Sequence, residues 1–152
     1  MQTRNILIIL SFIITFSNAE MNRSSDGIVT DDKTQLQWQD NYDENGGDVK
    51  TASWLEAIEY CENLTLGGYL DWRLPNIKEL YSLVDHTQYD PAIDPVFLFT
   101  ENGFYWTSTH SSPRRNGYAY HPYNISFSEG SLNTQYSTGD TLYVRCVRTA
   151  KK

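Results

Sequence analysis

The chain has 152 residues, of which 39% are hydrophobic and 20% are charged, and its formal net charge at pH 7 is −7. This length suits one compact domain rather than two. Contacts with backbone phosphates require a basic surface, so an acidic chain of this size is a poor general nucleic-acid binder and we expect no nucleic-acid partner.

The first residues have the organisation of a secretory signal peptide. Arg4 precedes an apolar run over residues 6–16, which is followed by Ser17, Asn18 and Ala19. A basic start, a short apolar segment and small residues at a cleavage site predict export, with cleavage after Ala19. The run is about half as long as the roughly 20 residues of a spanning helix. We therefore expect residues 1–19 to be removed, no stable membrane span afterwards, and a periplasmic or secreted protein.

A short leader and a β-hairpin are expected next. Residues 20–27 are polar and predict a loose leader, so that the folded domain spans 28–149. The stretch GIVTDDKTQLQWQD contains two short β-type runs, with the turn between them at residues 31–34.

The polar loop NYDENGGDVK partly matches a calcium-binding loop. Asn41, Asp43, Asn45 and Gly46 occupy positions 1, 3, 5 and 6 of that pattern, but Ala52 stands where a bidentate glutamate is needed. The three histidines also fit no compact metal motif. We interpret the loop as a solvated turn, and we expect no metal and no cofactor.

The next segment predicts an amphipathic helix. In SWLEAIEYCENL, Trp54, Ile58 and Cys61 share one face at helical spacing, joined by either Leu64 or Leu55. Ser53 and Glu56 have the spacing of a capping box, and two glycines after Leu66 end the helix.

The stretch DWRLPNIKEL predicts a turn into a second, shorter helix. Asn76 is a good N-cap, and Glu79 again has capping-box spacing. Arg73 lies between Trp72 and Leu74, where it is expected to bond buried carbonyls or an acid. We interpret Arg73, Asn76 and Glu79 as a structural corner rather than a substrate site.

The remainder of the chain predicts mostly β-structure. Residues 86–103 form a proline-punctuated loop, and β-type runs follow at 104–110, 118–127, 130–137 and 141–150. In the last run Leu142, Val144 and Cys146 face one way, and Tyr143, Arg145 and Val147 face the other. Two helices followed by a run of strands indicate an α+β fold rather than alternating βα units.

Cys61 and Cys146 are the two cysteines of the chain. An even count in an exported protein favours a disulfide, and two cysteines allow one intramolecular pairing. The bond would close a loop of about 85 residues, which the chain-entropy model rates at roughly 4–5 kcal/mol. A metal pair or a catalytic thiol is the alternative. However, neither cysteine has a CxxC-type neighbour, and the spacing of the histidines pairs none of them with either cysteine.

The segment HSSPRRNGYAYHPY is either an ordinary exposed loop or a ligand-binding segment, and it supplies the candidate ligand-binding residues. Adjacent arginines can bind carboxylate or sulfate, and tyrosine rings can pack on a sugar face. The candidate ligand-binding residues are Arg114, Arg115, Asn116, Tyr118 and Tyr120. No G-x-S-x-G, P-loop or dinucleotide motif is present, so no catalytic residue is assigned and we expect a protein that is not an enzyme.

The motifs VTDDKTQLQWQD, WLEAIEYCENLTLGGYLDWRLPNIKELYSLVD, YDPAIDPVF, YWTST and YVRCVR follow one another in order. Together they resemble the bacterial domain of unknown function 1566, also called the Lcl C-terminal domain after the collagen-like adhesin of Legionella, over about residues 28–148. The resemblance implies a C-type-lectin-like fold with two helices, a curled antiparallel sheet and a long loop region. It also implies a bond between a cysteine of the first helix and one of the last strand, which here are Cys61 and Cys146.

The resemblance implies a binding function as well, because the named adhesin is associated with sulfated glycans on host surfaces. This chain has no collagen-like Gly-X-Y stretch. It also lacks the Glu-Pro-Asn, Gln-Pro-Asp and Trp-Asn-Asp triplets of calcium-dependent lectins, so a calcium-dependent mode of sugar binding is not implied.

A second likeness points to an enzyme class. The Arg-Leu-Pro triplet before a helix is similar to formylglycine-generating enzymes, but those use a close pair of cysteines near the C-terminal end, where Cys146 stands alone. The main expectation is a non-catalytic module that binds carbohydrate in adhesion, with a sulfated glycan as one candidate ligand. The alternatives are a protein-interaction or structural role in the envelope, and, as a minor one, such an enzyme. The expected partner is a glycan or an envelope or host-surface protein, and a homo-oligomer is left open.

Overall fold

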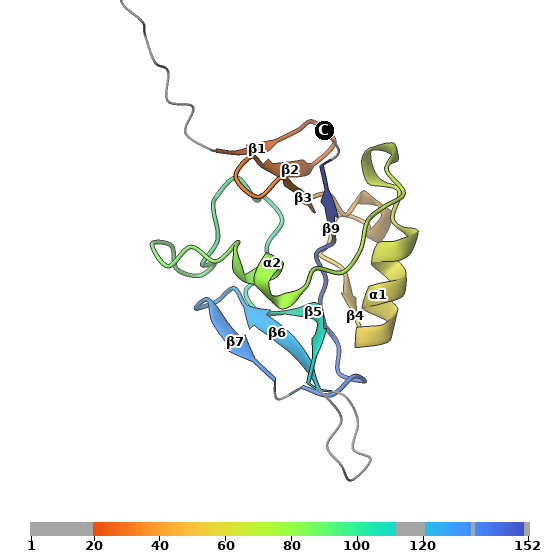
Figure 1. The fold of residues 1–152 in the computed structure, drawn as a ribbon, viewed down its shortest axis with the longest axis vertical. Coiled ribbons are helices and arrows are strands. Elements are labelled where there is room, and N and C mark those ends of the chain that lie inside the picture. Colours follow the sequence, from red (N-terminus) through yellow and green to blue (C-terminus); the bar gives the residue numbers. More distant parts are fainter. Residues whose placement is uncertain (1–19, 112–120, 135, 151–152) are drawn as a thin grey trace, which may run out of the picture.

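The computed structural model describes residues 20–111, 121–134 and 136–150, and these residues form an α+β fold as the sequence predicts (Figure 1). The helices are α1 (Trp54–Asn63) and α2 (Ile77–Tyr81), with 3₁₀ turns η1 (Asp43–Asn45) and η2 (Leu66–Gly68). The strands are β1 (Met21–Arg23), β2 (Ile28–Asp31), β3 (Leu36–Gln39), β4 (Thr51–Ala52), β5 (Phe104–His110), β6 (Pro122–Ser126), β7 (Ser131–Asn133), β8 (Leu142–Tyr143) and β9 (Val147–Thr149).

The strands belong to two sheets. A four-stranded sheet has the order β1-β2-β3-β9, and a five-stranded sheet has the order β4-β8-β5-β6-β7. Neighbouring strands are antiparallel except β5 and β8, which pair in parallel at Tyr105 and Tyr143. Figure 1 shows the two sheets at opposite ends of the domain, with α2 between them and α1 along one side. Within the described residues, neither helix has the length and the apolar composition of a membrane-spanning helix.

The predicted hairpin is present as β2 and β3. The Asp31 carboxylate holds the turn, because it accepts hydrogen bonds from the backbone N–H groups of Lys33 (2.9 Å) and Thr34 (3.3 Å) and from the Thr34 hydroxyl (2.6 Å). The prediction of a loose leader at residues 20–27 missed strand β1, which pairs with β2. β1 is a three-residue edge strand with no fully buried side chain, so its sequence carries no apolar signal.

Two apolar cores fill the domain. The first lies between the four-stranded sheet, α2 and the inner face of β5 and β6, and the second lies beneath α1. The buried residues of the first core are Val29, Leu36, Trp38, Tyr42, Val49, Leu80, Leu83, Ile93, Phe97, Tyr105, Ile125, Phe127 and Val147. Those of the second are Ile28, Ala52, Trp54, Ala57, Cys61, Leu64, Trp72, Leu74, Trp106, Leu142, Val144 and Cys146.

The last β-type run lies between these cores. Leu142, Val144 and Cys146 are buried in the second core, whereas Tyr143 and Val147 pack in the first. The predicted alternation of side chains is therefore confirmed. The prediction of one continuous strand is wrong, because the run passes from one sheet to the other and forms β8 and β9.

Helix α1 begins and packs as its sequence predicts. The Glu56 carboxylate accepts hydrogen bonds from the Ser53 N–H (3.0 Å) and hydroxyl (2.7 Å), which closes the capping box and lowers the pKa of Glu56. Leu64 is buried and Leu55 is 66% exposed, which settles which leucine belongs to the inner face. The predicted disulfide is confirmed: Cys61 and Cys146 are bonded, with their Cα atoms 5.4 Å apart.

Candidate functional site

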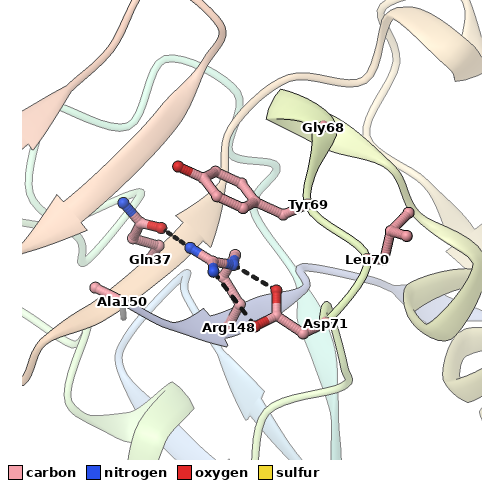
Figure 2. Close-up of a pocket in the computed structure, with 7 residues that line it drawn as sticks. All are labelled: Gln37, Gly68, Tyr69, Leu70, Asp71, Arg148 and Ala150. Atoms are coloured by element: carbon pink, nitrogen blue, oxygen red, sulfur yellow. Dashed lines mark hydrogen bonds and ion pairs between the residues drawn. The ribbon is translucent and has the colours of Figure 1, made fainter. Parts of the chain in front are cut away.

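An open hollow of about 460 Å³ lies where β3, β9 and the turn after η2 meet (Figure 2). Three segments that are far apart in the sequence build it. Its lining residues are Gln37, Gly68, Tyr69, Leu70, Asp71, Arg148 and Ala150.

The turn that carries Tyr69 depends on a glycine and on a buried indole. Gly67 has a φ of 65°, and a Cβ atom there would lie 2.6 Å from the side chain of Ile28. A side chain at this position would be strained by the backbone conformation and would require the end of the Ile28 side chain to shift. Trp72 is 2% exposed and donates from its indole N–H to the backbone oxygen of Leu66 (3.0 Å). With both ends of the turn fixed, Tyr69 and its neighbours point outward.

Arg148 forms the floor of the hollow. It is 2% exposed, and its Nε donates to Asp71 Oδ1 at 2.7 Å while Nη2 donates to Oδ2 at 3.3 Å. Nη1 donates to Oε1 of Gln37. The guanidinium carbon lies 3.6 Å from the centroid of the Tyr69 ring, a cation–π contact (Figure 2). All three nitrogens of Arg148 are therefore engaged by the protein.

The groups that reach solvent around this floor are an aromatic ring, an apolar side chain and a carboxylate. Tyr69 is 40% exposed, Leu70 is 77% exposed, and the Asp71 side chain is 41% exposed. A ring face can pack on the C–H groups of a ligand, and a carboxylate accepts hydrogen bonds from hydroxyl or amide donors. This arrangement can hold an amphipathic ligand such as a saccharide.

A second hollow, of about 470 Å³, borders the loop at residues 41–50, which partly matches a calcium-binding pattern. There Asn41 accepts a hydrogen bond from the Asp43 N–H (2.8 Å), and the Asn45 amide donates to the backbone oxygen of Asp48 (2.7 Å). These contacts belong to a local turn. Among the residues that the structure describes, no group of three or more His, Cys, Asp or Glu side chains could hold a metal ion.

One polar cluster of this second hollow is rigidly built. Tyr60 donates from its hydroxyl to Glu44 and accepts a hydrogen bond from the buried Gln39 amide (2.6 Å). Burial and the bond to the Glu44 carboxylate raise the pKa of Tyr60, so it is a neutral donor at physiological pH. The cluster joins η1 to α1.

The structure brings the three predicted corner residues together. The Asn76 side chain accepts hydrogen bonds from the N–H groups of Lys78 (2.9 Å) and Glu79 (3.0 Å), and the Glu79 carboxylate accepts from the Asn76 N–H (2.8 Å). Arg73 forms a bidentate pair with Glu79 at 2.7 and 2.6 Å. Arg73 also exchanges two backbone hydrogen bonds with Val147, each 2.9 Å long, so the corner is fixed to β9.

We expect Arg73→Ala to lower the free energy of unfolding by about 1 kcal/mol at neutral pH, a value that allows for the 41% exposure of the Arg73 side chain. Burial opposes ionisation of Glu79, but the bonds from Arg73 and Asn76 outweigh it and lower the pKa of this carboxyl. The contribution of the pair is thus complete above the ordinary glutamate pKa and is lost as the pH falls below it. Urea unfolding of both proteins from pH 7 to 3 should show the difference shrinking. Loss of ligand binding with unchanged stability would instead place Arg73 in a binding site.

The predicted ligand-binding residues Arg114, Arg115, Asn116, Tyr118 and Tyr120 lie outside the residues that the structure describes.

The residues around the Tyr69 hollow were not predicted as a site. Gln37, Asp71 and Arg148 are unremarkable polar residues in their own segments. The one local signal is the stretch GGYLDW, in which a tyrosine and a leucine follow two turn-forming glycines and precede an aromatic anchor.

The fold and the hollow define an α+β module with an internal disulfide and an exposed surface site that contains an aromatic and an acidic side chain. The chain belongs to the Lcl C-terminal domain family, whose model matches residues 27–148. Comparisons with curated proteins and with solved structures gave no match. Membership in this family indicates an adhesin-related module.

Proposed function

We propose that this protein is a non-catalytic adhesion module that binds carbohydrate outside the cytoplasm. The observation that carries the proposal is the hollow of an adhesin-related domain in which the Tyr69 ring and the Asp71 carboxylate lie over a buried arginine. A ring and a hydrogen-bonding side chain next to each other match the two kinds of surface that a pyranose presents, its C–H face and its hydroxyl edge.

The rigidity of the hollow supports binding. Arg148 holds the Tyr69 ring from below, and Arg148 is itself held by Asp71 and Gln37. A side chain that is already ordered loses less conformational entropy when a ligand packs on it. Tyrosine also offers a large contact surface with few rotatable bonds.

Several features support the proposed C-type-lectin-like fold and the proposed export. Two helices, a long irregular segment at residues 86–103 and a disulfide between α1 and the segment before β9 match what the resemblance implied. Disulfides persist in oxidising compartments, which agrees with a periplasmic or secreted location. The signal peptide at residues 1–19 lies outside the described residues and stays a proposal.

The test is a glycan array followed by titration of any retained saccharide. We expect Tyr69→Ala to weaken binding at least tenfold, because the ring face is lost, and Tyr69→Phe to stay within about threefold of wild type. Tyr89→Ala is the matched control, since Tyr89 is 82% exposed in the loop of residues 86–103 and should not change affinity. Binding that survives Tyr69→Ala but is lost in Arg114→Ala plus Arg115→Ala would move the site to the segment expected from the sequence.

A groove of about 360 Å³ favours the second candidate function, contact with an envelope or host-surface protein. It lies between α2 and the edge strand β7, where Tyr81 is 44% and Leu132 is 49% exposed. An apolar groove beside an edge strand can receive an extended segment of another chain. If no glycan is retained and a pull-down from envelope extract recovers a partner that Leu132→Asp releases, this candidate replaces carbohydrate binding.

A further inference from the structure

We infer that the Tyr69 hollow selects unsulfated saccharides over their sulfated counterparts. The inference rests on the proposed carbohydrate binding and names the ligand class for the hollow. It excludes for this hollow the sulfated glycan that the resemblance offered as one form of the carbohydrate ligand.

The first argument is the accessibility of positive charge. Sulfate recognition uses exposed guanidinium or ammonium groups that donate to the anion. Arg148 is the one cation among the lining residues that the structure describes, and it is 2% exposed. Its Nε and Nη2 donate to Asp71 and its Nη1 donates to Gln37. The Tyr69 ring covers it at 3.6 Å. An approaching sulfate meets the ring and the carboxylate, not the guanidinium.

The second argument is the hydrogen-bonding character of the exposed groups. The Asp71 carboxylate is 41% exposed and, when ionised, can only accept hydrogen bonds. Gln37 is already engaged at both ends of its amide, because its oxygen accepts from Arg148 and its nitrogen donates to the Thr30 hydroxyl at 3.1 Å. A ligand must therefore bring donors to Asp71. Sugar hydroxyls, amides and ammonium groups do so, whereas an ionised sulfate has no proton to donate.

A rearrangement that exposes Arg148 is opposed by its contacts. Turning the guanidinium outward breaks its bonds to Asp71 and Gln37 and removes the support of the Tyr69 ring. The formal net charge of −7 adds a long-range repulsion of anionic ligands. Among the described lining residues, the Tyr69 hydroxyl and the second N–H of the Gln37 amide are neutral side-chain donors, and neutral donors are a weak substitute for a cation.

The experiment compares saccharides in three matched forms: N-acetylglucosamine oligomers, the same oligomers with 6-O-sulfate, and the N-deacetylated oligomers, within an array that holds sulfated and unsulfated pairs of other sugars. Only signal lost in Tyr69→Ala is counted. We expect the unsulfated member of each retained pair to bind at least tenfold more tightly at low salt, and the N-deacetylated form to bind no more weakly than the neutral one.

Two variants assign the preference to the hollow. Asp71→Asn, checked for folding by urea unfolding, should reduce the ratio between neutral and sulfated ligands at least threefold. Lys151→Gln plus Lys152→Gln removes the cations that follow Ala150 in the sequence and should leave that ratio in favour of neutral ligands. Tighter Tyr69-dependent binding of the sulfated members would overturn the inference while carbohydrate binding stood. Retention of glycans that does not depend on Tyr69 would also overturn the inference, whereas no retention of any glycan would defeat the proposed function itself.

Discussion

Asp40→Asn is expected to lower the free energy of unfolding by about 3–5 kcal/mol, the usual cost of removing one partner from a buried ion pair. Asp40 is fully buried and lies between Arg23 (Nε to Oδ2, 2.7 Å) and the fully buried Arg145 (Nη1 to Oδ1, 3.5 Å). Its two oxygens also accept hydrogen bonds from the N–H groups of Leu98 (2.9 Å) and Phe99 (3.1 Å). The asparagine amide would present donors to a site that consists of donors and would leave Arg145 without its counter-charge.

Equilibrium urea unfolding, followed by tryptophan fluorescence, measures this effect. Asp32→Asn is the matched control, because it makes the same chemical change on an exposed residue of the β2–β3 turn and should stay within about 0.5 kcal/mol of wild type. A loss below 1 kcal/mol for Asp40→Asn, with an unchanged m-value, would show that Arg145 does not depend on this carboxylate.

The size of the effect follows from what Asp40 joins. Arg23 comes from the edge strand β1, Leu98 and Phe99 come from the long loop, and Arg145 comes from the segment between β8 and β9. The guanidinium carbon of Arg145 also lies 4.5 Å from the centroid of the Phe97 ring. One carboxylate therefore connects three segments, two of which also meet where Arg145 donates to the Phe99 oxygen and the Thr100 hydroxyl. The loss of this carboxylate acts on the packing of all three.

The features that the sequence predicts well are those with local causes. The two capping boxes need residues three positions apart, the hairpin turn needs Asp31 and its next three residues, and the cysteine pairing has one solution. The alternation of the final segment is predicted too, because residue parity alone decides which core each side chain enters.

The features that the sequence does not predict are those that join distant segments. Asp40 follows a strand, a position that is typical of a turn residue. Nothing in the neighbouring sequence identifies Arg145, 105 positions later, as its partner. The Tyr69 hollow is missed for the same reason, since Gln37, Asp71 and Arg148 meet only after β3 and β9 have paired. Strand β1 is missed because an edge strand of exposed and half-buried residues has no apolar pattern.

Replacement of both cysteines, Cys61→Ala with Cys146→Ala, is expected to cost about 4–5 kcal/mol of unfolding free energy. The bond closes a separation of 85 residues, and the chain-entropy model gives this magnitude for a loop of that length. Both residues are fully buried in the second core, so alanine is chosen over serine, whose hydroxyl groups would be buried without a designed partner. The loss is a large part of the 5–15 kcal/mol that a domain of this kind usually has.

Unfolding in the presence of a reductant distinguishes the stabilising effect of the disulfide bond from that of the packing of the two sulfur atoms. Wild type that is unfolded and refolded in dithiothreitol should fall to within about 1 kcal/mol of the double variant, while the double variant should not respond to dithiothreitol. Equal stability of oxidised wild type and double variant would show that the bond adds nothing to the packed core.

The double variant also tests how far ligand binding at the Tyr69 hollow depends on the disulfide. Cys146 lies two residues before Arg148 and tethers the start of β9 to α1, so ligand binding by the double variant should decline in step with its unfolded fraction.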